Sequence, residues 1–350
     1  MGRYPNFDFL RLAAAVSVIF SHSYLIAEGT QAREPFVILT GNQTIIGLAG
    51  VFIFFIVSGF LVTRSFETRP SPGRYLAARS LRIFPGLIIC ILICTFLLGP
   101  AMTTLPLRDY FAAPKTWHFL ADNLLLKSND EALPGVLFSM TPAGTVVNGT
   151  LWTLPIEFQC YLMVLALGLA RLLNGRIAML LFLGGLLTST LDLLGGFGWL
   201  LPVFAAGMVL HYVTGRHRLS GALALAAFLG LAATVRFGGF LQAFPVLGGY
   251  LTIYLGTHPR LRLPDAARFG DLSYGLYIYG WPAEQCVAYA LGPAATWWSV
   301  FTLGLALSFV LAFLSWHGVE KLALRWKPAG MTAKSPDLRG VELLARQSAG

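Results

Sequence analysis

Apolar residues are gathered in long runs, separated by short polar segments. Ten of these runs approach the roughly 20 residues that a helix needs to cross a bilayer. They are centred on Phe9–Ala27, Ile45–Val62, Ile83–Leu98, Leu151–Ala170, Ile177–Leu194, Trp199–Val213, Leu219–Val235, Phe244–Gly256, Ser273–Leu291 and Trp297–Trp316. The pattern predicts an all-α integral membrane protein with about ten transmembrane helices, of which the third, sixth and eighth are short.

The same pattern predicts a simple domain organisation, because we find no soluble domain, low-complexity segment or internal repeat. We expect one transmembrane domain over residues 1–326 and a polar cytoplasmic tail over 327–350, disordered or bound to the surface. The first run lacks the small-residue cleavage site that follows a signal peptide, so we expect it to stay in the chain as a helix.

Charge is scarce, and its placement indicates topology. Only 12% of the 350 residues are charged and 56% are hydrophobic, whereas soluble domains carry roughly twice that charged fraction. The net charge is +9. If the N-terminus is cytoplasmic, most arginines fall in inner loops, as the positive-inside rule describes, and both termini are cytoplasmic. We therefore assign the basic charge to topology and expect no nucleic-acid partner, since no basic face interleaved with aromatic residues occurs.

The cysteines give no sign of a metal site or a disulfide. All four lie within apolar runs, at Cys90, Cys94, Cys160 and Cys286. Their spacing does not fit a zinc site, and none lies in an external loop. We expect them to pack as small apolar residues, and we expect no bound metal.

Two ionisable residues lie in the first apolar run, "RLAAAVSVIFSH", which extends from Arg11 to His22. They are eleven residues apart, which is close to three helical turns, so both lie on one helix face about 16 Å apart along the axis. Ionisable groups at membrane depth indicate function. The alternative is that Arg11 extends to the lipid headgroups and that His22 forms an interhelical hydrogen bond.

A carboxylate in the fourth run is the predicted partner of His22. Glu157 lies about two turns below the outer surface if its run begins there, which is close to the depth of His22. A carboxylate beside an imidazole raises its basicity and fixes its tautomer, as a general base requires. The alternative is a lone buried glutamic acid that stays protonated.

Arginines are dense in the inner segment "TRSFETRPSPGRYLAARSLRIFP". Arg79 and Arg82 are three residues apart and share a helix face at the start of the third run. Guanidinium groups bind phosphates through a planar fork of donors, so this pair is a candidate site for a phosphorylated ligand. The alternative is a basic loop that holds the protein against anionic lipid.

Six segments together resemble the acyltransferase-3 family of integral membrane O-acyltransferases, over about Phe7 to Leu324. They are "FDFLRLAAAVSVIFSH", "GVFIFFIVSGFLV", "RSLRIFP", "LWTLPIEFQCYL", "LSYGLYIYGWP" and "HGVEKLAL", in the order that the family shows. Each motif alone is weak, and the ordered set is specific.

The resemblance implies ten core helices in the bacterial inner membrane and transfer of acetyl or related acyl groups to hydroxyls. The donor would be acyl-coenzyme A, with no permanently bound cofactor, and the acceptor a cell-surface or exported glycan, free or lipid-linked. It also implies that Arg11 and His22 match an Arg-x10-His motif with His22 as the base, and that Arg79 and Arg82 match a donor-binding Arg-x-x-Arg motif. We expect Glu157 to support His22, and Arg11 to bind the donor together with Arg79 and Arg82.

The chain departs from the family pattern at two points that bear on the predicted function. The family usually has Trp-His-Trp-Pro where this chain has "YGWP", so Gly280 replaces a histidine. No esterase domain of the SGNH type follows the last run. A transporter or flippase that uses His22 and Glu157 as a proton relay is the alternative function, although no two related halves of the kind common in transporters are found.

The longest loop in the predicted topology is external, from Gly99 to Thr150. Such length exceeds that of an ordinary connection. The spacing of Trp117, Phe119, Leu120 and Leu124 predicts an amphipathic helix on the outer leaflet, either as a cover for the acceptor site or as a lipid anchor.

Overall fold

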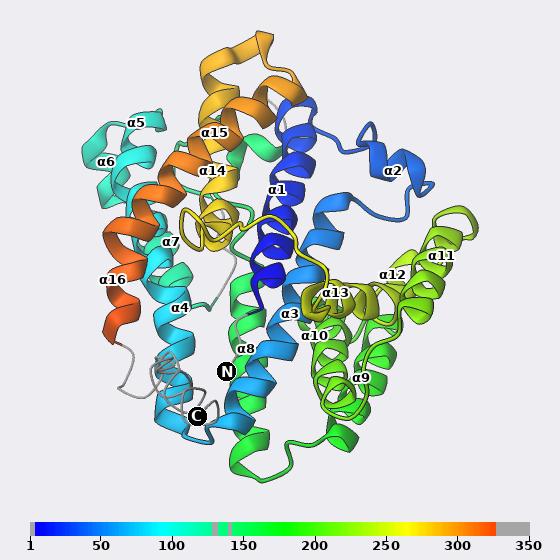
Figure 1. Ribbon diagram of the computed structural model, residues 1–350. Helices are drawn as coiled ribbons and strands as arrows, with labels where there is room; N and C mark the ends of the chain where they lie inside the picture. Colours follow the sequence, from blue (N-terminus) through cyan, green and yellow to red (C-terminus); the bar gives the residue numbers. More distant parts are fainter. Residues whose placement is uncertain (1–3, 128–131, 139–141, 327–350) are drawn as a thin grey trace, which may run out of the picture.

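The computed structural model describes residues 4–127, 132–138 and 142–326, which form a bundle of helices without a β-strand (Figure 1). The longer helices are α1 (Pro5–Glu28), α3 (Ile46–Thr68), α4 (Pro72–Ile93), α7 (Pro114–Leu124), α8 (Thr153–Leu169), α9 (Gly175–Thr190), α10 (Gly195–Thr214), α11 (Gly221–Phe237), α13 (Leu247–Thr257), α14 (Ser273–Leu291) and α15 (Trp297–Ser315). The short helices are α2 (Pro35–Leu39), α5 (Gly99–Met102), α6 (Leu107–Ala112), α12 (Phe240–Ala243) and α16 (Lys321–Ala323). The predicted tail at 327–350 lies outside the described residues.

Each predicted apolar run corresponds to a helix of this bundle, so the all-helical fold class is confirmed. Five helical segments are long and apolar enough to cross a membrane, namely Asn6–Glu28, Ile46–Thr68, Pro72–Met102, Gly195–Thr214 and Trp297–Trp326. The helices α8, α9 and α11 are apolar but shorter, and α14 is buried over most of its length. Ten crossings and two cytoplasmic termini therefore remain predictions.

The helix α1 lies at the centre of the packing and contacts α3, α14 and α15. It runs antiparallel to α3, because Ser21 contacts Gly47 while Phe7 packs against Phe60 near the other end. The helix α3 in turn packs on α10, and α10 on α9. Figure 1 shows α9, α10, α11 and α13 grouped on one side of α3, away from α4 and α14.

Glycines allow the backbones of α3 and α10 to approach closely. A Cβ atom built on Gly59 would overlap the carbonyl oxygen of Phe204, and one built on Gly207 would overlap that of Ile56. Small residues at such crossings allow the van der Waals packing that holds helices together in a membrane, where lipid is as apolar as the helix surface.

A proline in α14 connects three parts of the fold. Pro282 has no N–H, so the carbonyl of Ile278 one turn earlier lacks its helical partner. The Nδ2 atom of Asn148 donates to that carbonyl at 2.9 Å, and the Sγ atom of Cys90 donates to it at 3.3 Å. The segment before α8 and the helix α4 are thus both held against α14.

The segment before α8 is itself packed inside the bundle. The indole N–H of Trp281 donates to the carbonyl of Val146 at 2.9 Å, and the side chain of Gln285 donates to the same carbonyl at 2.9 Å. Asn148 is fully buried. The helix α8 therefore begins within the protein and not at its surface.

The predicted helix near Trp117 is confirmed as α7. Phe119 is fully buried while Lys115 and His118 are exposed, so the helix is amphipathic, although Trp117 is exposed as well. Its contacts are with α4 and α6. A position on the outer leaflet stays a prediction.

The close crossing of α3 and α10 makes Gly59 a sensitive position. We expect Gly59→Ala to destabilise the protein by about 2 kcal/mol, as overpacking of a tight core does, because the new methyl group would meet backbone and not a flexible side chain. Thermal unfolding in detergent measures this. The matched control is Gly184→Ala on α9, where nothing lies within 4 Å of the added atom. Equal melting temperatures for the two variants would contradict the proposed crossing.

Candidate functional site

A cavity of about 410 Å³ lies between α1, α3, α4, α8 and α14, where predicted site residues from three apolar runs meet. The charged residues that line it are Arg11, Arg79, Arg82, Glu157 and Asp271. The structure thus brings four of the five predicted site residues to one cavity and adds an aspartate that the sequence analysis did not select.

The carboxylate of Asp271 is shared by two arginines. Its Oδ2 atom lies 2.9 Å from Nη2 of Arg82 and 3.9 Å from Nη1 of Arg11, and the hydroxyl of Ser273 donates to Oδ1 at 2.8 Å. Asp8 forms a second ion pair with Arg11 at 3.1 Å. Burial alone would raise the pKa of Asp271, but the charges of Arg82 and Arg11 outweigh burial and hold this pKa well below its usual value.

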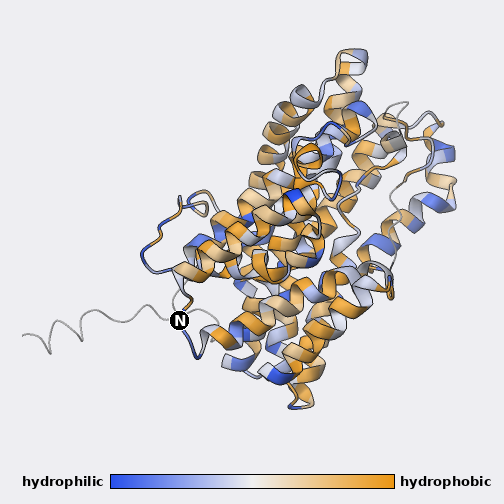
Figure 2. Cartoon of the chain, turned by 90° about the vertical axis from the view of Figure 1, so that its right-hand side faces the viewer, coloured by the Kyte–Doolittle hydropathy of each residue, from blue (hydrophilic) through white to orange (hydrophobic). Residues whose placement is uncertain are grey.

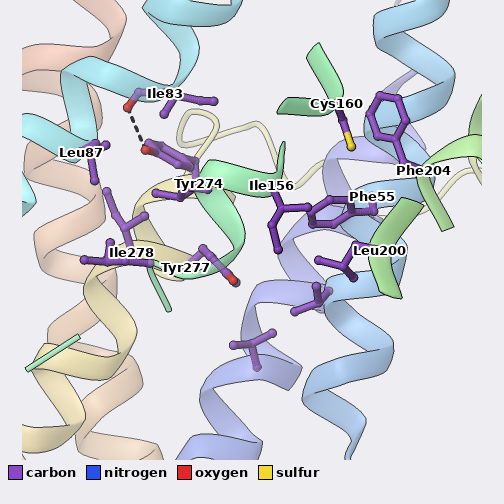
Figure 3. Packing of buried hydrophobic residues seen from close by; sticks show 14 of the residues in the cluster. Phe55, Ile83, Leu87, Ile156, Cys160, Leu200, Phe204, Tyr274, Tyr277 and Ile278 are labelled. Atoms are coloured by element: carbon purple, nitrogen blue, oxygen red, sulfur yellow. Dashed lines mark hydrogen bonds between the residues drawn. The ribbon is translucent and has the colours of Figure 1, made fainter. Parts of the chain in front are cut away.

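Tyr274, the second residue of α14, fixes α4 beside this ion pair. Its hydroxyl donates to the carbonyl of Ile83 at 2.7 Å (Figure 3). The guanidinium of Arg82 lies 5.7 Å from the centre of the Tyr274 ring. A carboxyl group, Glu320, also lies near, because a Cβ on Gly86 would be 3.2 Å from its Cδ atom and 2.9 Å from the Tyr274 ring.

Arg79 differs from its neighbour Arg82 because no carboxylate of the described residues forms an ion pair with it. It lies one turn earlier on α4, with its guanidinium 5.8 Å from the centre of the Tyr161 ring. Among the residues that the structure describes, Arg79 forms no salt bridge, and its buried Nε atom has no hydrogen-bond partner. The cavity therefore contains a guanidinium group whose donors are available to an anionic ligand.

Glu157 faces the same cavity from α8. Its Oε1 atom accepts a hydrogen bond from the hydroxyl of Ser58 at 3.1 Å and a second from the hydroxyl of Tyr161. Since Tyr161 also contacts Arg79, the carboxylate belongs to the arginine end of the cavity.

His22 is not among the residues that line this cavity. Its ring packs edge-on against Trp281 of α14, with 4.7 Å between ring centres. Its Nδ1 atom is buried without a hydrogen-bond partner. The imidazole is therefore held by an aromatic ring and not by a carboxylate.

The expected pairing of His22 with Glu157 is not found among the described contacts, and the register of α3 explains why. Gly47 donates to the hydroxyl of Ser21, next to His22, whereas Ser58 donates to Glu157. Ser58 lies eleven residues after Gly47, which is about 16 Å along the helix axis. Glu157 thus lies at the depth of Arg11 and not at the depth of His22.

The cavity extends from the arginines towards His22 and ends about one helical turn before it. Its last lining residue on α14 is Tyr277, one turn before Trp281. The hydroxyl of Tyr277 forms a hydrogen bond of 2.7 Å with Oγ1 of Thr153 on α8. On α3 the lining begins at Val51, whose neighbour Gly50 packs on Ser17 of α1. The Thr153–Tyr277 pair therefore lies at the end of the cavity nearest to the imidazole.

Sequence reasoning missed Asp271, Thr153 and Tyr277. Asp271 immediately precedes the segment "LSYGLYIYGWP", and it is an acid at the end of a basic loop, which was the available clue. Thr153 and Tyr277 are neutral residues inside apolar runs, and the sequence does not indicate that the start of α8 meets α14 at this hydrogen bond.

Comparison with known proteins gives matches over nearly the whole chain. A family profile described as "Acyltransferase domain" matches residues 4–317. An O-acetyl transferase of Shigella phage Sf6 is 29% identical over 332 residues, covering 90% of this chain and 94% of the phage protein. Nodulation protein 10 of Rhizobium leguminosarum bv. viciae is 27% identical over 366 residues, covering 93% of this chain and 94% of the Rhizobium protein. No solved structure matches the chain significantly.

The shared carboxylate generates a prediction about stability. We expect Asp271→Asn to destabilise the protein by about 2 to 3 kcal/mol, because Arg82 and Arg11 lose their ionised partner. The pKa of Asp271 is lowered in the folded state, so its contribution is present above the unfolded-state pKa near ~3.9 and is lost as the pH falls further. In thermal unfolding, the stability lost by Asp271→Asn relative to the parent should be constant from about pH 5 to 9 and smaller below about pH 4.

The control for this measurement is Asp265→Asn in the same loop. Asp265 is exposed and its Oδ1 atom accepts from the N–H of Ala267, which asparagine can also do. A cost for Asp271→Asn no larger than that for Asp265→Asn would show that the ion pairs contribute nothing to folding.

Proposed function

The chain belongs to this acyltransferase family, and we propose that it moves an acetyl group from acyl-coenzyme A to a hydroxyl of a cell-surface or exported glycan at the bacterial inner membrane. The similarity to an O-acetyl transferase of Shigella phage Sf6 supports acetyl as the transferred group. The observation that carries the proposal is the cavity that Arg11, Arg79 and Arg82 line together and that ends about one helical turn before His22.

The arginine end of the cavity suits the phosphates of the donor. Arg79 has donors without an acidic partner, while Asp271 holds Arg82 and Arg11 in fixed positions. Guanidinium groups that are already oriented lose little entropy when they bind phosphate. In this proposal Glu157 orients Tyr161 beside Arg79 and does not take part in proton transfer.

The middle of the cavity suits a thin, uncharged arm. Between the arginines and the Thr153–Tyr277 pair the lining is mainly apolar, with Phe54 and Phe55 of α3 on one wall. The distance along α1 from Arg11 to His22 is about 16 Å. An extended pantetheine arm has a similar length, so its thioester would reach the imidazole once it passes the Thr153–Tyr277 pair.

His22 is proposed as the general base. Its imidazole would take the proton of the acceptor hydroxyl, and the resulting alkoxide would attack the thioester carbonyl. Collapse of the tetrahedral intermediate breaks the carbon–sulfur bond, and the imidazolium returns the proton to the coenzyme A thiolate. The products are an ester and free coenzyme A, and no further reactant is needed. Trp281 fixes the ring plane during both proton transfers.

Two measurements test the proposal. The first is the release of coenzyme A from acetyl-coenzyme A by the purified protein. The second is mass spectrometry of surface glycans from cells with and without the gene. Loss of acetyl esters in cells without the gene supports it. Proton-coupled uptake of substrate without release of coenzyme A would instead support the transporter alternative.

His22 should be required for transfer but not for donor binding. We expect His22→Ala to lower the transfer rate by about 10² to 10⁴, the usual contribution of a general acid–base group. The affinity for acetyl-coenzyme A should stay within about twofold, because His22 does not line the arginine cavity. The control is His118→Ala on α7, where the side chain is exposed. Transfer within a few-fold of the parent would reject His22 as the base.

Arg79 should be required for donor binding. We expect Arg79→Ala to weaken acetyl-coenzyme A binding by about tenfold to a hundredfold, since a charge-assisted contact contributes about 1.5 to 3 kcal/mol. Arg79→Lys should weaken binding of acetyl-coenzyme A less than Arg79→Ala does, because the charge remains although the fork of donors is lost. Equilibrium binding at two salt concentrations measures the effect, which should be smaller at high salt.

The matched control is Arg74→Ala, an exposed position earlier on α4. Because Arg79 forms no salt bridge with any described residue, the melting temperature of the Arg79→Ala variant should remain close to that of the parent. Normal donor binding by both Arg79→Ala and Arg82→Ala would place the phosphates elsewhere and leave these arginines a topological role.

A further inference from the structure

A second hollow lies on the far side of α3, away from the proposed acyl-transfer site. It is an apolar groove of about 380 Å³ between the pair α9–α10 and the pair α11–α13. Phe182 and Leu210 form part of one wall, and Ala226, Ala227 and Leu247 form part of the other. Figure 2 faces this side of the molecule and shows its helices as predominantly hydrophobic.

One end of the groove continues into a basic hollow. This basic hollow is lined by Arg176 at the start of α9 and by Arg216 and His217 after α10. Met179 and Val209 line both the groove and the basic hollow, so the two form one continuous surface. A ligand that fits this surface must therefore have a long apolar part joined to an anionic part.

Within the described part of the chain, Arg176 and Arg216 have no acidic partner. Neither Arg176 nor Arg216 forms a salt bridge with any residue in the described part of the chain. The side chains of Arg176 and Arg216 are exposed. Their charge is therefore free to attract an anion at the edge of an apolar surface, where the headgroups of a bilayer lie.

We propose that this surface binds an anionic phospholipid, with its phosphate between Arg176 and Arg216 and one acyl chain between α9–α10 and α11–α13. The apolar groove excludes a free phosphate compound as the complete ligand, and the basic hollow distinguishes an anionic lipid from a zwitterionic one. The site shares no lining residue with the arginine cavity, so it goes beyond the proposed function and does not depend on it.

The experiment uses the full chain in mild detergent, with phosphatidylglycerol or phosphatidylcholine of the same acyl chains as probes. Native mass spectrometry counts retained lipid, and thermal unfolding gives the stabilisation. We expect the protein to retain phosphatidylglycerol preferentially and to melt at a higher temperature with it. The double variant Arg176→Gln/Arg216→Gln should bind phosphatidylglycerol roughly 30-fold more weakly, since each arginine near an anionic lipid contributes about fivefold.

Two further variants make the test specific. Arg260→Gln/Arg262→Gln removes two exposed arginines from the loop before α14, outside both hollows, and should retain phosphatidylglycerol as the parent does. Ala226→Trp fills the groove from an exposed position without changing charge and should also reduce retention.

Three results would overturn the proposal. The first is equal retention of the two lipids by the parent protein. The second is unchanged retention by the Arg176→Gln/Arg216→Gln variant. The third is a dimer that Ala226→Trp converts to a monomer while retained lipid stays the same, which would identify the groove as an interface between two copies of this chain.

Discussion

The proposed site depends on one carboxylate. Asp271 precedes α14, and its ion pairs with Arg82 on α4 and Arg11 on α1 join three segments that are far apart in sequence. In an apolar bundle a guanidinium group must find its partners inside the protein, because lipid offers none. Asp271 and Asp8 together balance the charges of Arg82 and Arg11. The ion pairs thus stabilise the fold, and Arg79 is the arginine of the cavity that forms no salt bridge among the described residues.

A second constraint comes from α14, where Pro282 leaves a carbonyl without its helical partner. The side chain of Asn148 satisfies that carbonyl, so the segment before α8 is packed inside the bundle. Thr153 then lies near enough to Tyr277 to form the hydrogen bond at the end of the cavity. A backbone requirement in one helix therefore places a hydrogen-bonded pair at the end of the cavity nearest to His22. In the proposed function, the arm of the donor has to pass this pair.

The sequence predicts the helices and the common face of Arg79 and Arg82 on α4 well, because hydrophobic runs and helical spacing are local properties. The depth of a residue within the bundle is not a local property, because it depends on how neighbouring segments pack. Glu157 is an example. Its predicted depth assumed that the fourth run begins at the membrane surface, but the residues before α8 are buried against Trp281 and Gln285. Glu157 therefore lies about three turns from the expected position. The carboxylate at Asp271 was missed for a related reason, since its two partners come from other helices.

The glycine at position 280 is explained by the contact between α1 and α14. A Cβ atom there would lie 2.8 Å from Cγ1 of Ile19, so a larger side chain would push the two helices apart. The close approach holds the next residue, Trp281, against His22 at 4.7 Å between ring centres. A histidine at this position, as in the family pattern, would need a different spacing of α1 and α14. In this chain an aromatic ring thus fixes the orientation of His22, and the proposed transfer requires only that one imidazole.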